Sequence, residues 1–328
     1  MRAILLAGAA LGLVVTTSAK AAPILIKFPH VVAESTPKGQ GAKLFEQLVE
    51  ERLAGRVEVQ VFPNASLMED DPSMEALAFG DVQMIAPSLS KFDRLTPKFQ
   101  VFDLPFMFDD TAALERFQES DIGRDLLRHI EDKGFLGLAY WHNGMKQLSA
   151  NRPLRTPADA KGLKFRIQES DVLEAQFRAL GANPQKLPFS EVYQALQTGT
   201  IDGQENTWAN IYSQKFFEVQ PYIVESNHGA LDYMLTVNAE FWHGLPDDIR
   251  GELEAIVAEV TATVNAQANE INAAARDKVV AAGKGEVLTL EPEQREAWRA
   301  ALAPVWDEFR EEIGAQIVAA AQAANPSN

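Results

Sequence analysis

Apolar and polar residues alternate with the period of a β-strand in two widely separated segments. Residues 57–62 have the sequence VEVQVF and residues 162–168 the sequence GLKFRIQ, so each segment has one apolar and one polar face. Residues 24–28 (ILIKF) form a third apolar segment that is typical of a strand. A stretch with helical periodicity follows each of the three, and this order predicts an α/β fold class.

Helix start and stop residues mark the first helix clearly. Thr36 is a favoured N-cap residue, Pro37 suits the first helical position, and Gly55 follows the last apolar position, Leu53. The same reasoning predicts shorter helices at residues 72–79, 110–119, 121–133, 170–180, 190–198 and 207–219. It predicts further strands at residues 81–86, 137–141, 200–202, 222–224 and 234–237, with a turn at residues 142–144.

The periodicity changes after Pro246. Apolar residues then recur every three or four positions from Ile249 to Val279, and the pattern ends at Gly283. A helix of this length is about 54 Å long at 1.5 Å per residue. No single small domain needs such a helix, so we expect it to lie across two domains. A second long helix is predicted at residues 293–323, with a kink at Pro304.

Two segments of the chain, called the echoing segments below, share one sequence pattern. Residues 76–83 (ALAFGDVQ) and residues 195–202 (ALQTGTID) share the order Ala-Leu-x-x-Gly-x-aliphatic-polar. Each copy follows a predicted strand, so each belongs to a strand–helix–glycine–strand unit. Two such units predict two α/β domains that are built alike and face each other across a cleft.

The second copy lies in the stretch PFSEVYQALQTGTIDGQEN, residues 188–206, whose end is strongly polar. Gly199 is the expected helix stop, and Gly203 allows a turn before Gln204, Glu205 and Asn206. Three amide or carboxylate side chains at a strand end suit the rim of a ligand site. A polar turn that joins a strand to a helix would explain them equally well.

The amino-acid composition excludes several kinds of catalytic and metal-binding site. With 328 residues the chain has room for two domains, and with no cysteine it lacks thiol catalysis, disulfides and cysteine-based zinc sites. The five histidines never stand four residues apart, and hydrolase, nucleotide-binding and dinucleotide motifs are absent from the sequence, so we expect no metal and no cofactor.

The net charge of the protein limits the kinds of molecule that it can bind. The formal net charge is −16, and it becomes −18 if residues 1–22, which carry Arg2 and Lys20, are removed. So acidic a protein repels nucleic acid and anionic membranes. An anionic ligand would therefore have to be captured by a few local cations.

The N-terminus has the features of a signal peptide over residues 1–22. Arg2 precedes the apolar run 3–15, and small residues around Ala21 suit cleavage near Ala21 or Ala22. The alternative is an uncleaved anchor, but this run is short for a membrane span, and no later run approaches the roughly 20 apolar residues required. We expect an exported protein without membrane insertion.

Three cations stand in suggestive positions. Arg166 alternates with apolar residues in the strand LKFRIQ, where it either faces solvent or forks two hydrogen bonds to a ligand carboxylate. Lys146, after the predicted turn, is either a surface residue or a second anchor for an anion with two carboxylates. Lys38 opposes the dipole of its helix and either is solvated or points into a site.

In its motifs the chain resembles the extracytoplasmic solute-binding subunits of TRAP transporters (tripartite ATP-independent periplasmic transporters). It is most similar to the DctP-type branch, which is associated with four-carbon dicarboxylates. The pattern PFSEVYQALQTG…DGQEN is highly specific to this family, and the resemblance covers nearly all of the chain after residue 22. The matching segments are KFPHVVAESTPKGQGA (27–42), VFPNASL (61–67), APSLSKF (86–92), FQVFDLPFMFDD (99–110), LAYWHNGMKQLS (138–149), GLKFRIQ (162–168), the run 177–206 and IYSQKFFEVQPY (211–222).

The resemblance implies two α/β domains hinged around a cleft that closes on one ligand, with the long helix at about residues 246–283 spanning both. The approximate limits are residues 23–143 with 232–271 for the first domain and residues 144–231 with 272–323 for the second. It also implies a periplasmic protein without enzymatic activity, expected to be a monomer, that delivers a small organic carboxylate to the TRAP membrane permease.

The resemblance further implies the ligand contacts. Arg166 matches the arginine that forms a salt bridge with a ligand carboxylate, Asn206 the asparagine that hydrogen-bonds it, and Phe189 an aromatic residue packed over the ligand. Lys146 stands where sialic-acid binders tend to carry arginine, which favours a small dicarboxylate. Residues on the first-domain side are expected to be His30, Lys38, Ser88 and Trp141.

Two departures from the family pattern are mild, and several functions stay open. Thr207 replaces a common proline, and Gln168 replaces a common apolar residue, which could adjust the pocket.

Other carboxylates, namely sugar acids, oxo acids and aromatic acids, are alternatives to a four-carbon dicarboxylate. A ligand receptor for a sensor kinase and an exported enzyme acting on small acids are the rival functions.

Overall fold

The computed structural model describes residues 22–326, so the predicted signal peptide lies outside the described residues except for Ala22. The strands are β1 (Ile24–Pro29), β2 (Val57–Phe62), β3 (Met84–Ile85), β4 (Phe135–Met145), β5 (Gln147–Ala150), β6 (Lys164–Ile167), β7 (Asn183–Lys186), β8 (Gly203–Asn206), β9 (Tyr222–Glu225), β10 (Ala230–Asn238) and β11 (Glu286–Thr289). The α-helices are α1 (Pro37–Arg52), α2 (Asp70–Phe79), α3 (Thr111–Gln118), α4 (Asp121–Arg128), α5 (Asp171–Ala179), α6 (Val192–Gln197), α7 (Trp208–Ser213), α8 (Ala239–His243), α9 (Asp247–Ala282), α10 (Pro292–Ile313) and α11 (Ala315–Ala323). The expected α/β class is confirmed.

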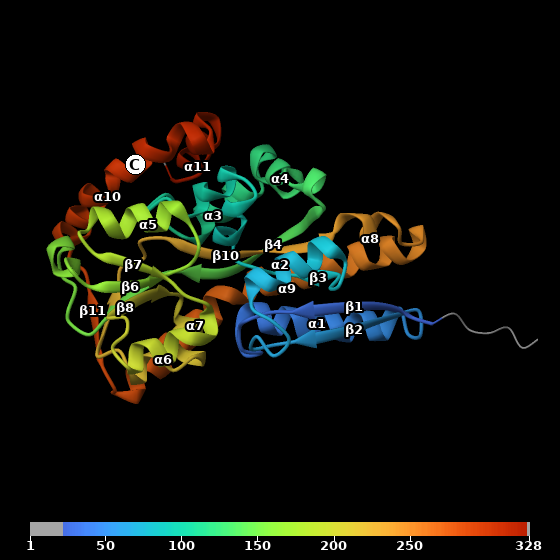
Figure 1. The fold of residues 1–328 in the computed structure, drawn as a ribbon, viewed down its shortest axis with the longest axis horizontal. Coiled ribbons are helices and arrows are strands. Elements are labelled where there is room, and N and C mark those ends of the chain that lie inside the picture. The colour runs from blue at the N-terminus through green and yellow to red at the C-terminus, as the bar shows by residue number, and fades with distance from the viewer. Residues whose placement is uncertain (1–21, 327–328) are drawn as a thin grey trace, which may run out of the picture.

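The strands form three sheets that build two lobes (Figure 1). The first lobe holds the parallel pair β1–β2 and the short strand β3, together with α1, α2 and two 3₁₀ helices, η1 (Leu89–Arg94) and η2 (Pro97–Phe102). The second lobe holds the mixed six-stranded sheet in the order β11-β9-β5-β8-β6-β7, with α5, α6 and α7. The antiparallel strands β4 and β10 and the helix α9 run from one lobe to the other.

The domain limits expected from the sequence fall close to these crossing points. Residue 143 is two residues before the end of β4, and residue 231 is one residue after the start of β10. The limits themselves stay a prediction. The long helix is confirmed, because α9 extends from Asp247 to Ala282 and ends at Gly283 with a φ of 59°.

Helix boundaries agree with the sequence where a cap residue decides them. The Thr36 hydroxyl accepts a hydrogen bond from the Gly39 amide at 3.2 Å, so α1 begins as predicted. The C-terminal helix differs from the prediction. It continues through the exposed Pro304 and breaks at Gly314, whose φ of 110° lies outside the helical region.

Two strand predictions were wrong. β4 continues through the predicted turn 142–144 to Met145, because β10 pairs with it along this whole length and a bulge absorbs the irregularity. The strand predicted at residues 200–202 is instead β8, and the expected turn residue Gly203 is its first member. The sequence also missed β5, β7 and β11, which are four residues long each.

The two echoing segments do adopt the same local fold. Gly80 and Gly199 end their helices with φ values of 80° and 70°. Residues after each glycine close the helix end, since the Asp81 amide donates to Ala76 O at 2.8 Å and the Ile201 amide to Ala195 O at 3.3 Å. The following strand therefore begins only four residues after the glycine, at Met84 and at Gly203.

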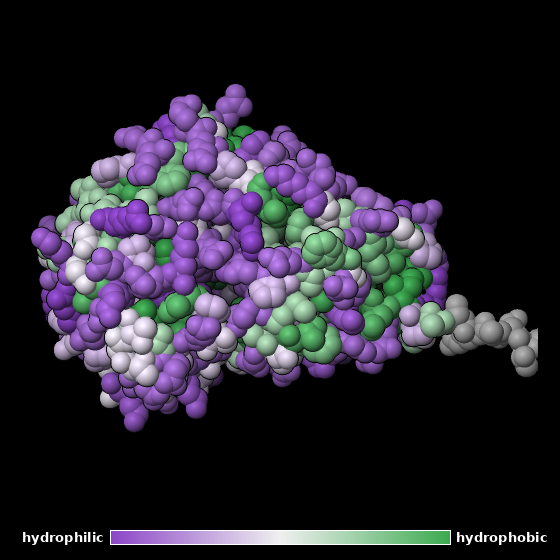
Figure 2. Space-filling model, viewed as in Figure 1, coloured by the Kyte–Doolittle hydropathy of each residue, from purple (hydrophilic) through white to green (hydrophobic). Residues whose placement is uncertain are grey.

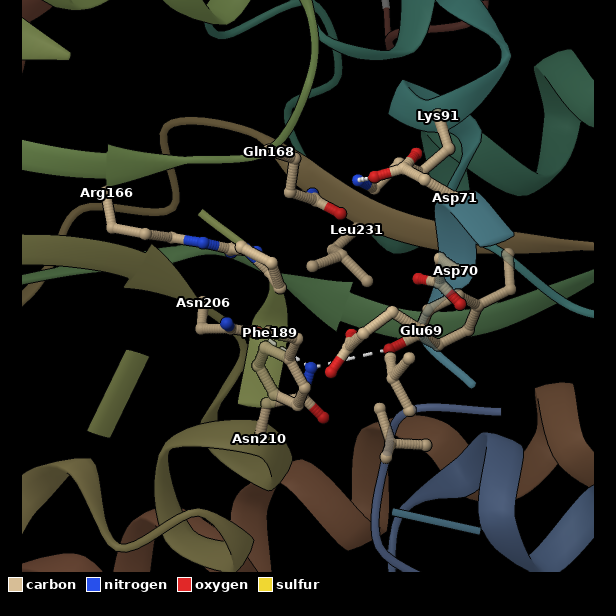
Figure 3. A pocket seen from close by; sticks show the side chains of 14 residues that line it. Glu69, Asp70, Asp71, Lys91, Arg166, Gln168, Phe189, Asn206, Asn210 and Leu231 are labelled. Carbon is tan, nitrogen blue, oxygen red and sulfur yellow. Dashed lines mark hydrogen bonds and ion pairs between the residues drawn. The ribbon is translucent and has the colours of Figure 1, made fainter. Parts of the chain in front are cut away.

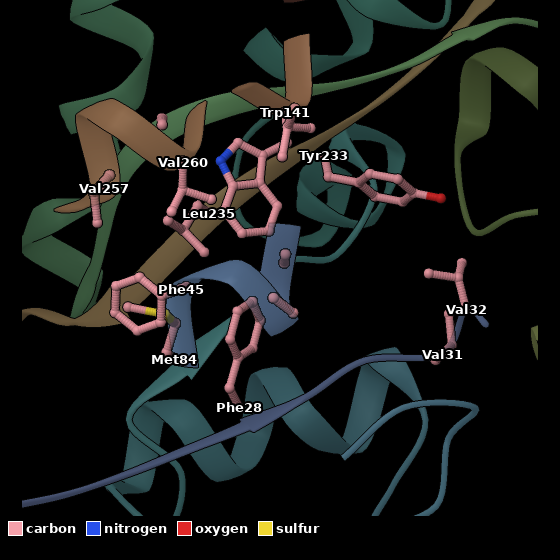
Figure 4. Packing of buried hydrophobic residues seen from close by; sticks show 14 of the residues in the cluster. Phe28, Val31, Val32, Phe45, Met84, Trp141, Tyr233, Leu235, Val257 and Val260 are labelled. Atoms are coloured by element: carbon pink, nitrogen blue, oxygen red, sulfur yellow. The ribbon is translucent and has the colours of Figure 1, made fainter. Parts of the chain in front are cut away.

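The largest hydrophobic core lies where α9 crosses β4 and α1 (Figure 4). Trp141 of β4 is fully buried there and contacts Phe28 of β1, with 6.1 Å between ring centroids. Its indole nitrogen donates to the Thr261 hydroxyl of α9 at 3.0 Å. Packing of α9 against α1, β4 and α7 thus joins the two lobes into one framework.

The visible surface is mostly polar, with apolar residues concentrated at the end where the described chain begins (Figure 2). Phe79 at the end of α2 is the most exposed large apolar residue described, with 84% of its surface accessible. Within residues 22–326, none of the helices combines the length and apolar character needed to cross a membrane.

Candidate ligand-binding site

A cavity lies between the two lobes (Figure 3). Residues from both lobes line it: Val31, Val32, Glu69, Asp70, Asp71, Lys91, Arg166, Gln168, Pro188, Phe189, Asn206, Asn210, Leu231 and Tyr233. Three of the residues expected from the sequence, Arg166, Phe189 and Asn206, are therefore brought together.

Arg166 enters the cavity from β6 and is 3% exposed. Its Nε donates to the backbone oxygen of Leu187 at 3.0 Å, and the guanidinium carbon lies 5.9 Å from the centroid of the Phe189 ring. No salt bridge joins this guanidinium to any residue within 22–326, so its terminal NH₂ groups are available to a ligand. Two parallel N–H donors match the two oxygens of a carboxylate.

Burial lowers the pKa of Arg166 to about 10, although Glu205 and the carboxylates of residues 69–71 raise it in part. The guanidinium consequently stays charged at neutral pH. A buried charge that lacks a protein partner favours a ligand of opposite charge, because pairing offsets the cost of desolvation.

Asn206 ends β8, between β5 and β6, and is 1% exposed. Its Oδ1 accepts hydrogen bonds from Asn210 Nδ2 at 2.7 Å and from the Thr207 amide at 3.2 Å. Because the oxygen is occupied, the Nδ2 group is the part of the side chain that can donate to a ligand. Of the three polar residues of this stretch, Asn206 lines the cavity, whereas Gln204 and Glu205 are not among its lining residues.

The first lobe contributes a charged wall that sequence reasoning missed. Glu69, Asp70 and Asp71 lie around the start of α2, and Lys91 of η1 pairs with Asp71 at 2.7 Å. In Figure 3 these side chains face Arg166 across the cavity. The sequence offered only an acidic run at a helix start, which the helix dipole alone explains.

Lys146 does not line this cavity, which corrects the expectation of a second free anchor. Its ammonium lies 2.7 Å from Glu205 Oε1, and both side chains are at most 2% exposed. The other oxygen, Glu205 Oε2, lies 2.7 Å from His228 Nε2. Lys146 follows β4 directly and Glu205 is in the middle of β8, so the strand pairing of β5 with β8 brings the charges together.

The pKa values of this triad follow from its burial and its charges. Burial opposes ionisation of Glu205, but the Lys146 ammonium and the His228 hydrogen bond outweigh it and lower the pKa to about 2. Burial lowers the pKa of His228 despite Glu205, so the imidazole is neutral at pH 7. The sequence left two interpretations of Glu205 open, a ligand rim and a polar turn. Glu205 instead neutralises Lys146.

The four residues expected on the first-domain side lie near the cavity or in the core, but none of them lines it. The Lys38 ammonium is fully buried, donates to Ala86 O at 2.8 Å and lies 3.7 Å from the centroid of the Tyr233 ring. The two ring nitrogens of His30 have no partner among the described residues, and burial with the nearby Lys38 lowers its pKa to about 3. Ser88 hydrogen-bonds Gln168, and Trp141 is a core residue.

Comparison with known proteins identifies the family of the chain. The family model for bacterial extracellular solute-binding protein family 7, DctP, matches residues 28–312. The C4-dicarboxylate-binding periplasmic protein DctP of Shewanella loihica is 55% identical over 309 residues, which are 93% of this chain and 91% of that protein.

Two solved structures are also similar. A TRAP periplasmic solute-binding protein from Shewanella oneidensis with bound succinate has a TM-score of 0.92 and 51% identity, and covers 93% of this chain and 100% of that one. A TRAP periplasmic solute-binding protein from Pseudomonas aeruginosa with bound L-malate has a TM-score of 0.85 and 54% identity, with 87% and 100% of the two chains covered. The chain thus belongs to the DctP family of bacterial extracellular solute-binding proteins, and it has the two-domain fold of the TRAP periplasmic members.

Proposed function

We propose that this protein binds a C4 dicarboxylate in the cavity between its lobes and delivers it to a TRAP permease in the membrane. The observation that carries the proposal is Arg166. It is a buried guanidinium that lines the cavity between the lobes, and its NH₂ groups have no salt-bridge partner within residues 22–326. The bound succinate and L-malate of the two similar structures support this class of ligand.

The other lining residues support specific roles in this proposal. Asn206 donates to the same carboxylate as Arg166, and Phe189 covers the ligand with its ring. Lys91 is the second cation that lines the cavity, and it takes the place that the sequence suggested for Lys146. Lys146 with Glu205 and His228 supports the sheet behind the site.

Titration calorimetry of the chain with succinate and with L-malate tests the proposal. We expect wild-type protein to bind both acids and Arg166→Ala to lose affinity about a hundredfold or more, because an unpaired buried carboxylate costs about 3–5 kcal/mol. Arg178→Ala is the matched control, since Arg178 of α5 is an exposed arginine outside the cavity. Unchanged affinity in Arg166→Ala, with the fold intact by circular dichroism, would overturn the assignment.

Transfer to the permease requires a released, exported protein. We infer periplasmic location from the predicted signal peptide and from the family, and we expect a monomer in gel filtration with multi-angle light scattering. Co-purification with permease subunits encoded beside its gene would support delivery to a TRAP permease. Co-purification with a sensor kinase alone would instead favour the receptor function.

A further inference from the structure

Gln168 ties the strand that carries Arg166 to the opposite lobe. It stands two residues after Arg166, directly after the end of β6, and it lines the same cavity (Figure 3). The Ser88 hydroxyl donates a hydrogen bond to Gln168 Oε1. Gln168 Nε2 makes a longer contact of 3.5 Å with the Ser90 hydroxyl.

The serines are themselves held in the first lobe. Ser88 forms a bridge with Tyr233 of β10 just before η1, and the Ser90 hydroxyl donates to Asp103 Oδ1 at 2.7 Å. All of these side chains are buried, with exposed fractions between 2% and 9%. An amide is suited to this place because it offers the acceptor and the donor that two buried hydroxyls need.

A second contact ties the same junction of β6 and α5 to the first lobe. Asp93 of η1 accepts a hydrogen bond from the Asp171 amide at 2.9 Å, in the first turn of α5. The Asp93 carboxylate, which belongs to the first lobe, thus accepts a hydrogen bond from one of the free backbone amides at the start of α5. The Arg166 strand is therefore fastened to the first lobe at Gln168 and again at Asp171.

We propose that Gln168 is a positioning residue that holds the two lobes together over a ligand bound to Arg166. The proposal rests on the proposed function, in that Arg166 binds the ligand carboxylate. Release then requires the Gln168–Ser88 hydrogen bond to break, so this bond slows dissociation. Because it forms between the lobes and not with the ligand, it also favours approach of the lobes when the ligand is absent.

Stopped-flow dissociation of L-malate from Gln168→Leu and from Ser88→Ala tests the proposal. We expect dissociation to be about tenfold faster in each variant, which corresponds to about 1.4 kcal/mol. Ser88 does not line the cavity, so its variant leaves the ligand contacts in place. Gln185→Leu is the matched control, because Gln185 is an exposed glutamine on β7, paired in register with Arg166.

The double variant Ser88→Ala with Gln168→Leu separates a tie between lobes from a direct contact with the ligand. If the two side chains act through one bond, the double variant dissociates no faster than either single variant. Independent, multiplying effects would show that Gln168 acts on the ligand directly, and unchanged dissociation in both single variants would also overturn the proposal.

Distances between the lobes provide a test that does not depend on the ligand. The chain has no cysteine, so spin labels on cysteines introduced at the exposed positions Ala78 of α2 and Gln197 of α6 are unique. In ligand-free protein we expect Gln168→Leu and Ser88→Ala to shift the distance distribution towards longer separations. An unchanged distribution would overturn the tie, whereas failure of wild-type protein to bind any dicarboxylate would overturn only the proposed function.

Discussion

At the residue scale, the site depends on which cations are already neutralised within the protein. Arg166 has no carboxylate partner in the described chain. Lys91 forms an ion pair with Asp71, and Lys146 forms a buried ion pair with Glu205. A ligand carboxylate gains most from the cation whose charge is least compensated. This ranking explains how a protein with a net charge of −16 can capture an anion.

Lys91 is therefore expected to be the second anchor of a dicarboxylate. Lys91→Gln should weaken the binding of succinate about tenfold and the binding of butyrate much less. Only succinate has a second carboxylate, and in the variant that carboxylate loses its contact with the Lys91 ammonium. Titration calorimetry of both acids measures this difference, and Lys43→Gln on the exposed face of α1 is the control. Equal losses for the two acids would contradict an anchoring role for Lys91.

The buried pair of Lys146 and Glu205 predicts an acid-sensitive stability. The folded-state pKa of Glu205, about 2, lies below its ordinary value of 4.5, so its stabilisation is present above pH 4.5 and is lost as the pH falls towards 2. Glu205→Gln should cost about 3–5 kcal/mol at pH 7, because it leaves the Lys146 charge buried without a partner.

Urea denaturation between pH 7 and pH 3 checks both statements. The double variant Lys146→Met with Glu205→Gln keeps His228 and removes both charges, so it should recover much of the stability and lose less of it below pH 4.5. A single Glu205→Gln variant as stable as wild type would show that Lys146 is not buried as a charge.

At the element scale, β8 depends on a glycine that the sequence indicated as a turn. A Cβ at Gly203 would lie 2.5 Å from Ser149 O and 2.6 Å from the Phe165 ring, so β8 could not keep its place between β5 and β6. Gly203→Ala should therefore cost about 1–3 kcal/mol and also weaken L-malate binding, since Asn206 is on the same short strand.

Gly199→Ala is the matched comparison for this prediction. Gly199 has a φ of 70° and nothing within 4 Å of an added Cβ, so its cost of about 1–2 kcal/mol is conformational only. Denaturation and calorimetry on both variants should show that only Gly203→Ala alters affinity. Wild-type affinity in Gly203→Ala would mean that β8 tolerates the added methyl group without moving Asn206.

Much of the element order could be predicted, because periodicity and caps are local properties. Thr36, Gly80 and Gly199 mark helix ends wherever the rest of the chain lies, and the helix α9 carries its own apolar stripe. β7 could not be predicted, because its four residues, NPQK, are strand only through pairing with β6. Pairing across the sheet is a tertiary property that a local pattern does not contain.

The site was predictable to a similar degree. Arg166, Phe189 and Asn206, which specific motifs of the second lobe carry, do line the cavity, and their contacts with a ligand stay a prediction. The role of Glu205 was missed because nothing in the run DGQEN shows that Lys146, 59 residues earlier, will lie beside it. Charge neutralisation by a distant partner becomes visible only when the sheet is formed.

At the scale of the whole molecule, α9 makes the two lobes one framework. Asn272 of α9 donates to Asn143 O of β4 at 2.7 Å and accepts from the Ala209 amide of α7 at 3.0 Å. Asn265, two turns earlier, hydrogen-bonds the backbone of His142 and Tyr140 in β4. The helix is thus fastened by side-chain bonds to the crossing strand and to the second lobe, and by packing to α1 of the first.

We therefore expect the two lobes to unfold together. Scanning calorimetry of ligand-free protein should show one transition with a calorimetric enthalpy equal to the van't Hoff enthalpy, because the largest core joins α9 to residues of both lobes. L-malate at a hundred times its dissociation constant should stabilise this single transition by about 2.7 kcal/mol. In Asn272→Leu, which removes the bonds to β4 and α7, the transition should broaden or split. Two separate transitions in wild-type protein, with only one of them shifted by L-malate, would show instead that the lobes are independent and that α9 belongs to one of them.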